Sequence, residues 1–103
     1  MIKKIEKISI GDFIQQGDVI LTYRGDIEYP NDPNMTTICH TGNNHQHSFS
    51  SPVAVVGDSF YLIGKTILEH QEHDHIELVG GEWHKTIVKE YDHWLEESRE
   101  VID

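Results

Sequence analysis

Short runs of apolar residues alternate with polar residues along this chain, and most runs end at a glycine-containing turn. No stretch sustains the 3.6-residue period of a long amphipathic helix, whereas side chains of a strand alternate between two faces. We therefore predict strands at residues 16–22, 35–40, 45–49, 53–56, 59–63, 65–69, 76–79 and 82–91. Many short strands joined by tight turns predict an all-β fold, a small barrel or sandwich of antiparallel strands, with a cupin-like barrel as one form.

The turns have their own sequence signatures. Gly57-Asp58 lies between two apolar runs and is the strongest hairpin signal in the chain. A second hairpin is predicted at residues 42–44, and residues 25–33 have the glycine, proline and asparagine content of a surface loop. Residues 92–101 fit either a short helix or an edge strand, so the assignment of the C-terminal tail stays open.

Length and charge limit the class of protein. The 103 residues fit one domain spanning 1–103, and 37% hydrophobic content supports a modest core. With 8 Lys and Arg against 18 Asp and Glu, the net charge of −10 repels polyanions, so we expect no extended nucleic-acid partner. A small ligand in a local pocket, including a nucleotide, is compatible with this charge. Because a small domain leaves much surface exposed, we also expect a homo-oligomer.

Cysteine content and the N-terminal segment indicate the compartment. Cys39 is the only cysteine, which excludes an intrachain disulfide and a Cys-x-x-Cys pair. Residues 1–7 are rich in charge and lack the apolar core of a signal peptide, and no apolar run reaches membrane-spanning length. We therefore expect a cytoplasmic protein with no membrane partner.

The histidines are the main chemical signal. Of eight, five fall in two short windows, at residues 45–47 and 70–75. Residues two apart on a strand share a face, so one strand would present His45 and His47 side by side. Imidazole is the commonest protein ligand for transition metals. We predict a divalent metal (zinc, iron, manganese or nickel) held by His45, His47, His70 and His73.

Other residues around these windows allow several roles. Glu72 lies between two histidines and is a candidate ligand or catalytic base for a metal-bound water. The isolated histidines His40, His84 and His93 are interpreted as structural, and we exclude them from the site. The opposing interpretation of the two windows is that they are surface histidines that titrate without a function.

A metal-free mechanism is the second chemical interpretation. Two imidazoles on opposite sides of a scissile bond can act as general base and general acid, while Lys89 stabilises an anionic oxygen. Tyr91 could donate a hydrogen bond at such a site, or it could pack in the core with Trp83 and Ile87, which occupy alternating positions. This arrangement suits phosphodiester chemistry.

Several segments in order resemble a small family of bacterial and phage proteins. Its members carry QGDVLL, TGHAH, HEEHxPIELP and GxYxVxxQREY elements, and this chain has QGDVIL at 16–21, TG at 41–42 before HQH at 45–47, HQEH at 70–73, IEL at 76–78, GEW at 81–83 and KEY at 89–91. The resemblance covers nearly the whole chain. The chain departs from the pattern by two residues inserted before His45, by His75 in place of proline, and by Lys89 in place of arginine.

These observations lead to three hypotheses. The first is a hydrolase, phosphodiesterase-like, that acts on a small phosphorylated or nucleotide-like ligand with metal assistance through His45, His47, His70, His73 and Glu72. The second is a non-catalytic module that sequesters a nucleotide-like signal, as a phage counter-defence protein would, and the phage association of the family motivates it. The third is a structural protein whose histidines have no function.

Overall fold

The computed structural model describes residues 2–5, 7–26, 29–32, 34–42 and 45–88, and the regular structure in these ranges is entirely β-strand. The strands are β1 (Ile2–Lys4), β2 (Phe13–Gln16), β3 (Val19–Gly25), β4 (Asn34–Gly42), β5 (His45–Val56), β6 (Ser59–Leu62), β7 (Thr66–Glu69), β8 (His75–Leu78) and β9 (Gly81–Ile87). The predicted all-β class is confirmed. In this part of the chain, no helix is long and apolar enough to cross a membrane.

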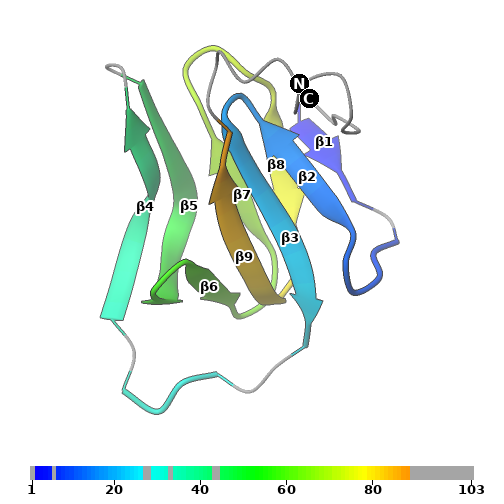
Figure 1. The fold of residues 1–103 in the computed structure, drawn as a ribbon, viewed down its shortest axis with the longest axis vertical. Coiled ribbons are helices and arrows are strands. Elements are labelled where there is room, and N and C mark those ends of the chain that lie inside the picture. Colours follow the sequence, from blue (N-terminus) through cyan, green and yellow to red (C-terminus); the bar gives the residue numbers. More distant parts are fainter. Residues whose placement is uncertain (1, 6, 27–28, 33, 43–44, 89–103) are drawn as a thin grey trace.

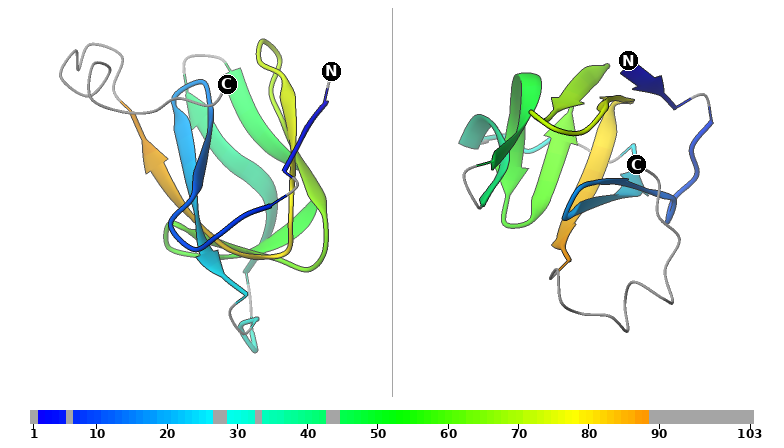
Figure 2. Two further views of the ribbon diagram at one scale, coloured as in Figure 1. Left: turned by 90° about the vertical axis from the view of Figure 1, so that its right-hand side faces the viewer. Right: turned by 90° about the horizontal axis from the view of Figure 1, so that it is seen from above.

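The strands form one mostly antiparallel sheet that curls into a half-barrel (Figure 1). The order along the sheet is β1-β8-β7-β5-β6-β9-β3-β2, and β4 pairs with β5 beside this path. The pairing of β1 with β8 is parallel, whereas the other pairings are antiparallel. Figure 2 shows how the curl brings the β2–β3 hairpin back over the strands at the other end of the sheet.

Strand boundaries differ from the sequence prediction at three places. The predicted strand at 16–22 is divided, because Gly17 adopts a φ of +59° and turns the chain between β2 and β3. The predicted strands at 45–49 and 53–56 are one strand, β5, since Pro52 sits at an irregularity in the β4–β5 register. The short strands β1 and β2 were not predicted, because their polar residues mask the alternation.

The core lies on the concave side of the curl and is built from the alternating apolar positions of the strands. Its largest fully buried side chains include Trp83, Phe60 and Leu21. The indole Nε1–H of Trp83 donates to the carbonyl oxygen of Val79 at 3.0 Å, so the ring is buried without an unpaired donor. Burying such large side chains is the main favourable term in the folding of a domain this small.

A single glutamine joins the two ends of the curled sheet. Gln16 of β2 is 1% exposed, and its Nε2 donates to the carbonyl oxygens of Leu68 in β7 and of Asp74 just before β8, each at 3.0 Å. Strand β2 is one end of the sheet order, and β7 and β8 lie next to the other end. These side-chain bonds therefore close the half-barrel at a place where none of the described strands forms a ladder across it. Residues 89–103, including Lys89, Tyr91 and the tail left open by the sequence, lie outside the described residues.

Candidate functional site

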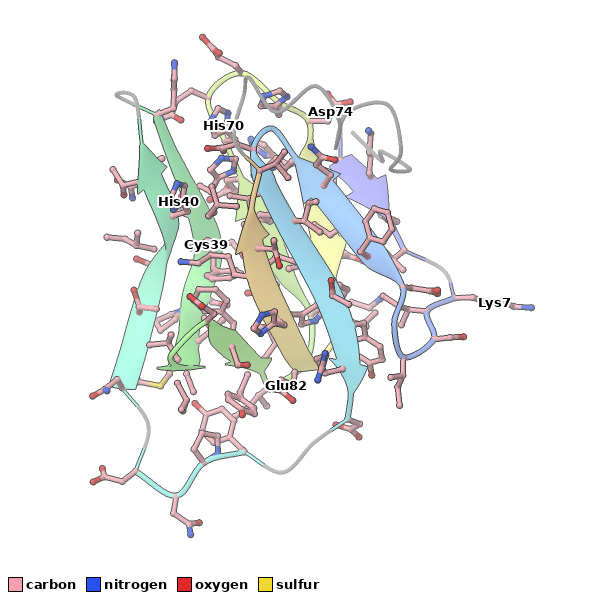
Figure 3. The ribbon with its side chains drawn as sticks, in the orientation of Figure 1. Lys7, Cys39, His40, His70, Asp74 and Glu82 are labelled. Carbon is pink, nitrogen blue, oxygen red and sulfur yellow. The ribbon has the colours of Figure 1, made fainter. Side chains whose placement is uncertain are left out.

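Three segments meet at one end of the half-barrel and bring most of the described histidines together. His45 and His47 lie on β5, and His40 of β4 is the direct cross-strand partner of His47. The connection between β7 and β8 contributes His70 and His73. Figure 3 shows His70 near the top of the molecule, at the end where the β2–β3 turn lies, and Glu82 near the opposite end.

These segments enclose a cavity of about 190 Å³. Its lining combines five imidazoles, two carboxylates and two glycines: His40, His45, His47, His70, His73, Asp18, Glu72, Gly17 and Gly42. Such a cavity is smaller than the roughly 300–1,000 Å³ that hold a drug-sized ligand. It fits an ion or one small polar group, and the rest of a larger ligand would lie outside it.

The two glycines allow the backbone to approach the histidines closely. A Cβ atom on Gly17 would lie 2.9 Å from His73 Nε2 and 3.4 Å from His47 Cε1. On β4, Gly42 pairs with His45, and a Cβ there would lie 3.3 Å from His40 Nε2. At Gly17, the positive φ and the 2.9 Å approach to His73 together favour a residue without a side chain.

The histidine rings form a continuous cluster. The ring centre of His70 lies 4.2 Å from that of His47, 4.9 Å from that of His73 and 5.4 Å from that of His45, and the rings of each pair are tilted. His40 lies 6.2 Å from His47 on the other side. His70 therefore has three imidazoles beside it, and His40 extends the cluster by one more ring.

Burial sets the charge state of the two innermost rings. The pKa of His47 is lowered to about 4, first by burial and then by the charge that His70 would carry, while the Asp18 carboxylate opposes the shift. The pKa of His70 is also lowered, first by burial and then by the neighbouring imidazoles of His73 and His45. Both rings are therefore neutral near pH 7, and each carries one proton on one of its two nitrogens.

Hydrogen bonds place the proton of His47 on Nδ1. Because Gln16 Nε2 donates to two carbonyl oxygens, its Oε1 must be the atom that faces His47 Nδ1, at 2.8 Å. An amide oxygen accepts, so Nδ1 donates and Nε2 of the neutral ring holds a lone pair. That Nε2 lies 3.0 Å from Asp18 Oδ1. Oxygen acceptors thus face both ring nitrogens, Gln16 Oε1 at Nδ1 and Asp18 Oδ1 at Nε2, and a proton or a metal cation between Nε2 and Oδ1 would be stabilised by both atoms.

The proton of His70 lies on the other nitrogen. The backbone N–H of Glu72 donates to His70 Nδ1 at 3.1 Å, so this nitrogen is an acceptor. A neutral ring then carries its proton on Nε2. His47 and His70, with ring centres 4.2 Å apart, thus have opposite tautomers. The cavity contains one imidazole that accepts through Nε2 and one that donates through Nε2.

The two carboxylates are more exposed than the inner histidines, and each lies near a different one of the outer histidines. Asp18 Oδ2 is 3.8 Å from His40 Nε2, and Glu72 Oε1 is 3.6 Å from His45 Nε2. Their side chains are 35% and 64% exposed, whereas that of His47 is 3% exposed. As the side chains stand, no three His, Cys, Asp or Glu residues within the described ranges are grouped tightly enough to hold a metal ion.

The structure can be compared with the residues proposed from the sequence. It gathers His45, His47, His70, His73 and Glu72 around the cavity. Lys89 and Tyr91 fall outside the described residues.

Three residues of the cavity and its surroundings were missed by sequence reasoning. His40 was set aside as isolated, yet its β-sheet pairing with His47 places it in the lining. Asp18 also lines the cavity, and Gln16 holds His47 from behind. The QGD element at 16–18 was the available signal, but it was interpreted only as a turn that leads into a strand and not as part of a site.

A larger hollow of about 780 Å³ lies at the other end of β3. Three tyrosines, Tyr23, Tyr29 and Tyr61, line it with Asp26. No histidine of the described ranges lines it, and the hydroxyl of Tyr61 donates to Glu82. The histidine cavity is therefore the better candidate for chemistry, because it has several groups that exchange protons or bind metals.

The chain was also compared with known proteins. No protein-family model matches it, and the searches of curated proteins and of solved structures found no match. The resemblance to the QGDVLL and QREY pattern therefore remains a prediction from the sequence, and the function has to be argued from the cavity itself.

Proposed function

We propose that the histidine cavity binds a divalent transition metal, and that the protein uses the metal to hydrolyse a small phosphorylated or nucleotide-like ligand. The observation that supports this most directly is the pair formed by His47 and Asp18. The Nε2 lone pair of His47 lies 3.0 Å from Asp18 Oδ1, inside a cavity that four other imidazoles line. A cation, either a proton or a metal ion, between these two atoms is stabilised by both of them.

The hydrogen bond behind His47 supports the same proposal. Histidine ligands usually donate their second ring N–H to an oxygen acceptor, which orients the ring and strengthens it as a ligand. Gln16 Oε1 is such an acceptor, 2.8 Å from His47 Nδ1, and Gln16 is itself fixed by two backbone carbonyls. The ring is thus held with its lone pair available before any ion arrives.

The remaining ligands would come from the rim. His45 and Asp18 have side chains that are 40% and 35% exposed, so they have room to rotate toward an ion held at His47. His73 lines the cavity beside Gly17. Modest rotations of these side chains are needed, because the described residues do not already form a group of three.

The chemistry then divides between the metal and the residues at the rim. A divalent metal in this position supplies Lewis-acid activation of a phosphoryl oxygen and of water. Glu72, which is 64% exposed and lines the cavity, would take a proton from the attacking water. The cavity volume of about 190 Å³ admits a phosphoryl group and leaves the rest of the ligand outside.

The test measures metal and turnover on the same preparations. We expect the purified, untagged chain to hold one transition metal per chain, measured by elemental analysis, and to hydrolyse bis(p-nitrophenyl) phosphate when zinc, manganese, iron or nickel is supplied. The double variant His47→Ala, His73→Ala should lose both. His84→Gln is the matched control, because His84 of β9 pairs with Thr22 and Ser59, away from the cavity.

Three other results would contradict parts of the proposal. Absence of metal in the wild-type chain would refute the metal site. Full turnover by the metal-stripped chain would transfer the reaction to metal-free acid–base chemistry by the histidines. Metal without turnover of any phosphorylated probe, but with tight retention of unaltered nucleotide, would make the protein a sequestering module instead of an enzyme.

A further inference from the structure

His70 lies at the centre of the histidine cluster, and its hydrogen bonds give it a different role from its neighbours. Its ring centre is within 5.4 Å of those of His45, His47 and His73. The residue is 8% exposed and lines the cavity. Any small ligand that fills the cavity must therefore come close to this ring.

A metal ion binds a nitrogen lone pair, and the neutral ring of His70 has none to offer while its present hydrogen bond persists. The Glu72 N–H donates to the Nδ1 lone pair at 3.1 Å, and Nε2 carries the proton. His47 has the reverse arrangement, because Gln16 accepts its Nδ1–H. Of these two adjacent rings, only that of His47 has a nitrogen lone pair free to bind a metal ion.

We infer that His70 is not a metal ligand but the residue that donates a hydrogen bond from Nε2 to an anionic oxygen of the substrate. The ligand class is an oxyanion such as a phosphate or a phosphate ester, held between this N–H and a metal at His47 and Asp18. The inference rests on the proposed function and narrows its substrate class. It divides the four histidines of the sequence prediction into metal ligands and one anion donor.

Charge makes the inference more specific. Asp18 and Glu72 place two carboxylates on the cavity, and among the residues that the structure describes no Lys or Arg lines it. An anion entering this cavity without a metal would be repelled, and one neutral N–H would offset only part of that repulsion. Oxyanion binding should therefore be strong only after metal has been added.

The tautomers can be tested directly on the metal-free protein. Long-range proton–nitrogen NMR spectra of the ¹⁵N-labelled chain distinguish a ring protonated on Nε2 from one protonated on Nδ1. We expect the Nε2–H form for His70 and the Nδ1–H form for His47, each assigned by the signal lost in its glutamine variant. A His70 ring protonated on Nδ1 would overturn the inference, whatever the outcome for the proposed function.

The roles are tested by two substitutions at the same position. His70→Met removes the N–H at similar volume, and we expect it to retain one metal per chain but to bind inorganic phosphate at least tenfold more weakly than the metal-loaded wild type. His70→Gln keeps an N–H donor and should restore part of the phosphate affinity. By contrast, His47→Met should lose the metal.

The outcomes separate this inference from the proposed function. Loss of metal in His70→Met, comparable to the loss in His47→Met, would make His70 a metal ligand. That result would refute the inference but would agree with the proposed metal site. If the wild-type chain binds no metal, the proposed function fails. The inference is then decided by phosphate titration of the metal-free chain: weaker binding in His70→Met supports an anion donor, and unchanged or undetectable binding overturns it.

Discussion

Replacing Gln16 by methionine tests how the cavity is connected to the closure of the sheet. The substitution keeps the side-chain length but removes hydrogen bonds to Leu68 O, to Asp74 O and to His47 Nδ1. Leaving a buried polar group without a partner costs about 1–3 kcal/mol. The Asp74 carbonyl is in a connection that water can reach, so we count two fully buried losses at about 1–2 kcal/mol each, the lower part of this range, and expect the free energy of unfolding to fall by about 2–4 kcal/mol.

The assay is urea unfolding of both proteins, followed by circular dichroism and by the fluorescence of the buried Trp83. For a chain of this size, with a slope of about 1–1.5 kcal/mol per molar urea, the expected loss moves the midpoint by about 2 M. The adjacent residue gives a matched control. Gln15 is equally buried, but its Oε1 has no partner within the described residues, and its Nε2 makes one bond, to Gly17 O.

Gln15→Met should therefore change the free energy of unfolding by less than about 1 kcal/mol, because removing an unpaired acceptor offsets the lost bond. Equal losses in the two variants would show that burial of an amide, and not the closure bonds, determines the stability of this corner. A loss below about 1 kcal/mol for Gln16→Met would refute the reasoning that Gln16 joins the ends of the half-barrel.

Three further predictions concern single positions. Gly17→Ala should destabilise by at least about 1 kcal/mol more than Gly57→Ala in urea unfolding, because both have nearly the same positive φ but only Gly17 would place its Cβ against histidine rings; equal losses would exclude the steric contribution. Burial raises the pKa of Cys39 from 9.0 to about 12, so the folded thiol should resist iodoacetamide at pH 8. The neutral thiol adds stability below pH 9, and this contribution is lost as the pH rises toward 12. Between pH 8 and 10.5 the free energy of unfolding of the wild type should therefore fall by about 2 kcal/mol more than that of Cys39→Ala. An equal fall in the free energy of unfolding of Cys39→Ala over this pH range would show that Cys39 is not the group responsible. Trp83→Phe should cost about 2–3 kcal/mol by calorimetry, since it opens a void in the core and leaves the Val79 carbonyl without its donor, and a cost below about 1 kcal/mol would contradict this packing.

The fold class could be read from the chain because its signals are local. Alternating short runs and glycine turns require strands, and the Gly57-Asp58 hairpin between β5 and β6 lies where the turn chemistry predicts it. Strand limits were predicted less well, since the sequence alone does not decide whether Gly17 and Pro52 each lie within a strand or between two strands. Whether a glycine starts a strand or ends one depends on which neighbours the strand pairs with.

The candidate site shows the same division. The two histidine windows are a composition signal, and the structure places four of their five histidines, all but His75, on one cavity. His40 could not be found in this way, because it is seven residues from His47 in the sequence, and its position depends on the β4–β5 register. The contribution of Asp18 likewise depends on the curl that carries the β2–β3 turn over the sheet.

The sequence by itself thus determined an all-β chain, an acidic surface and a concentration of imidazoles, because each follows from residue type and short spacing. The tertiary structure decided which nitrogen of each central histidine holds the proton. That choice depends on Gln16, 31 residues from His47, and on the backbone N–H of Glu72, and neither partner is apparent until the sheet has curled. The difference between an accepting and a donating imidazole therefore arises from long-range hydrogen bonds and not from the histidine pattern itself.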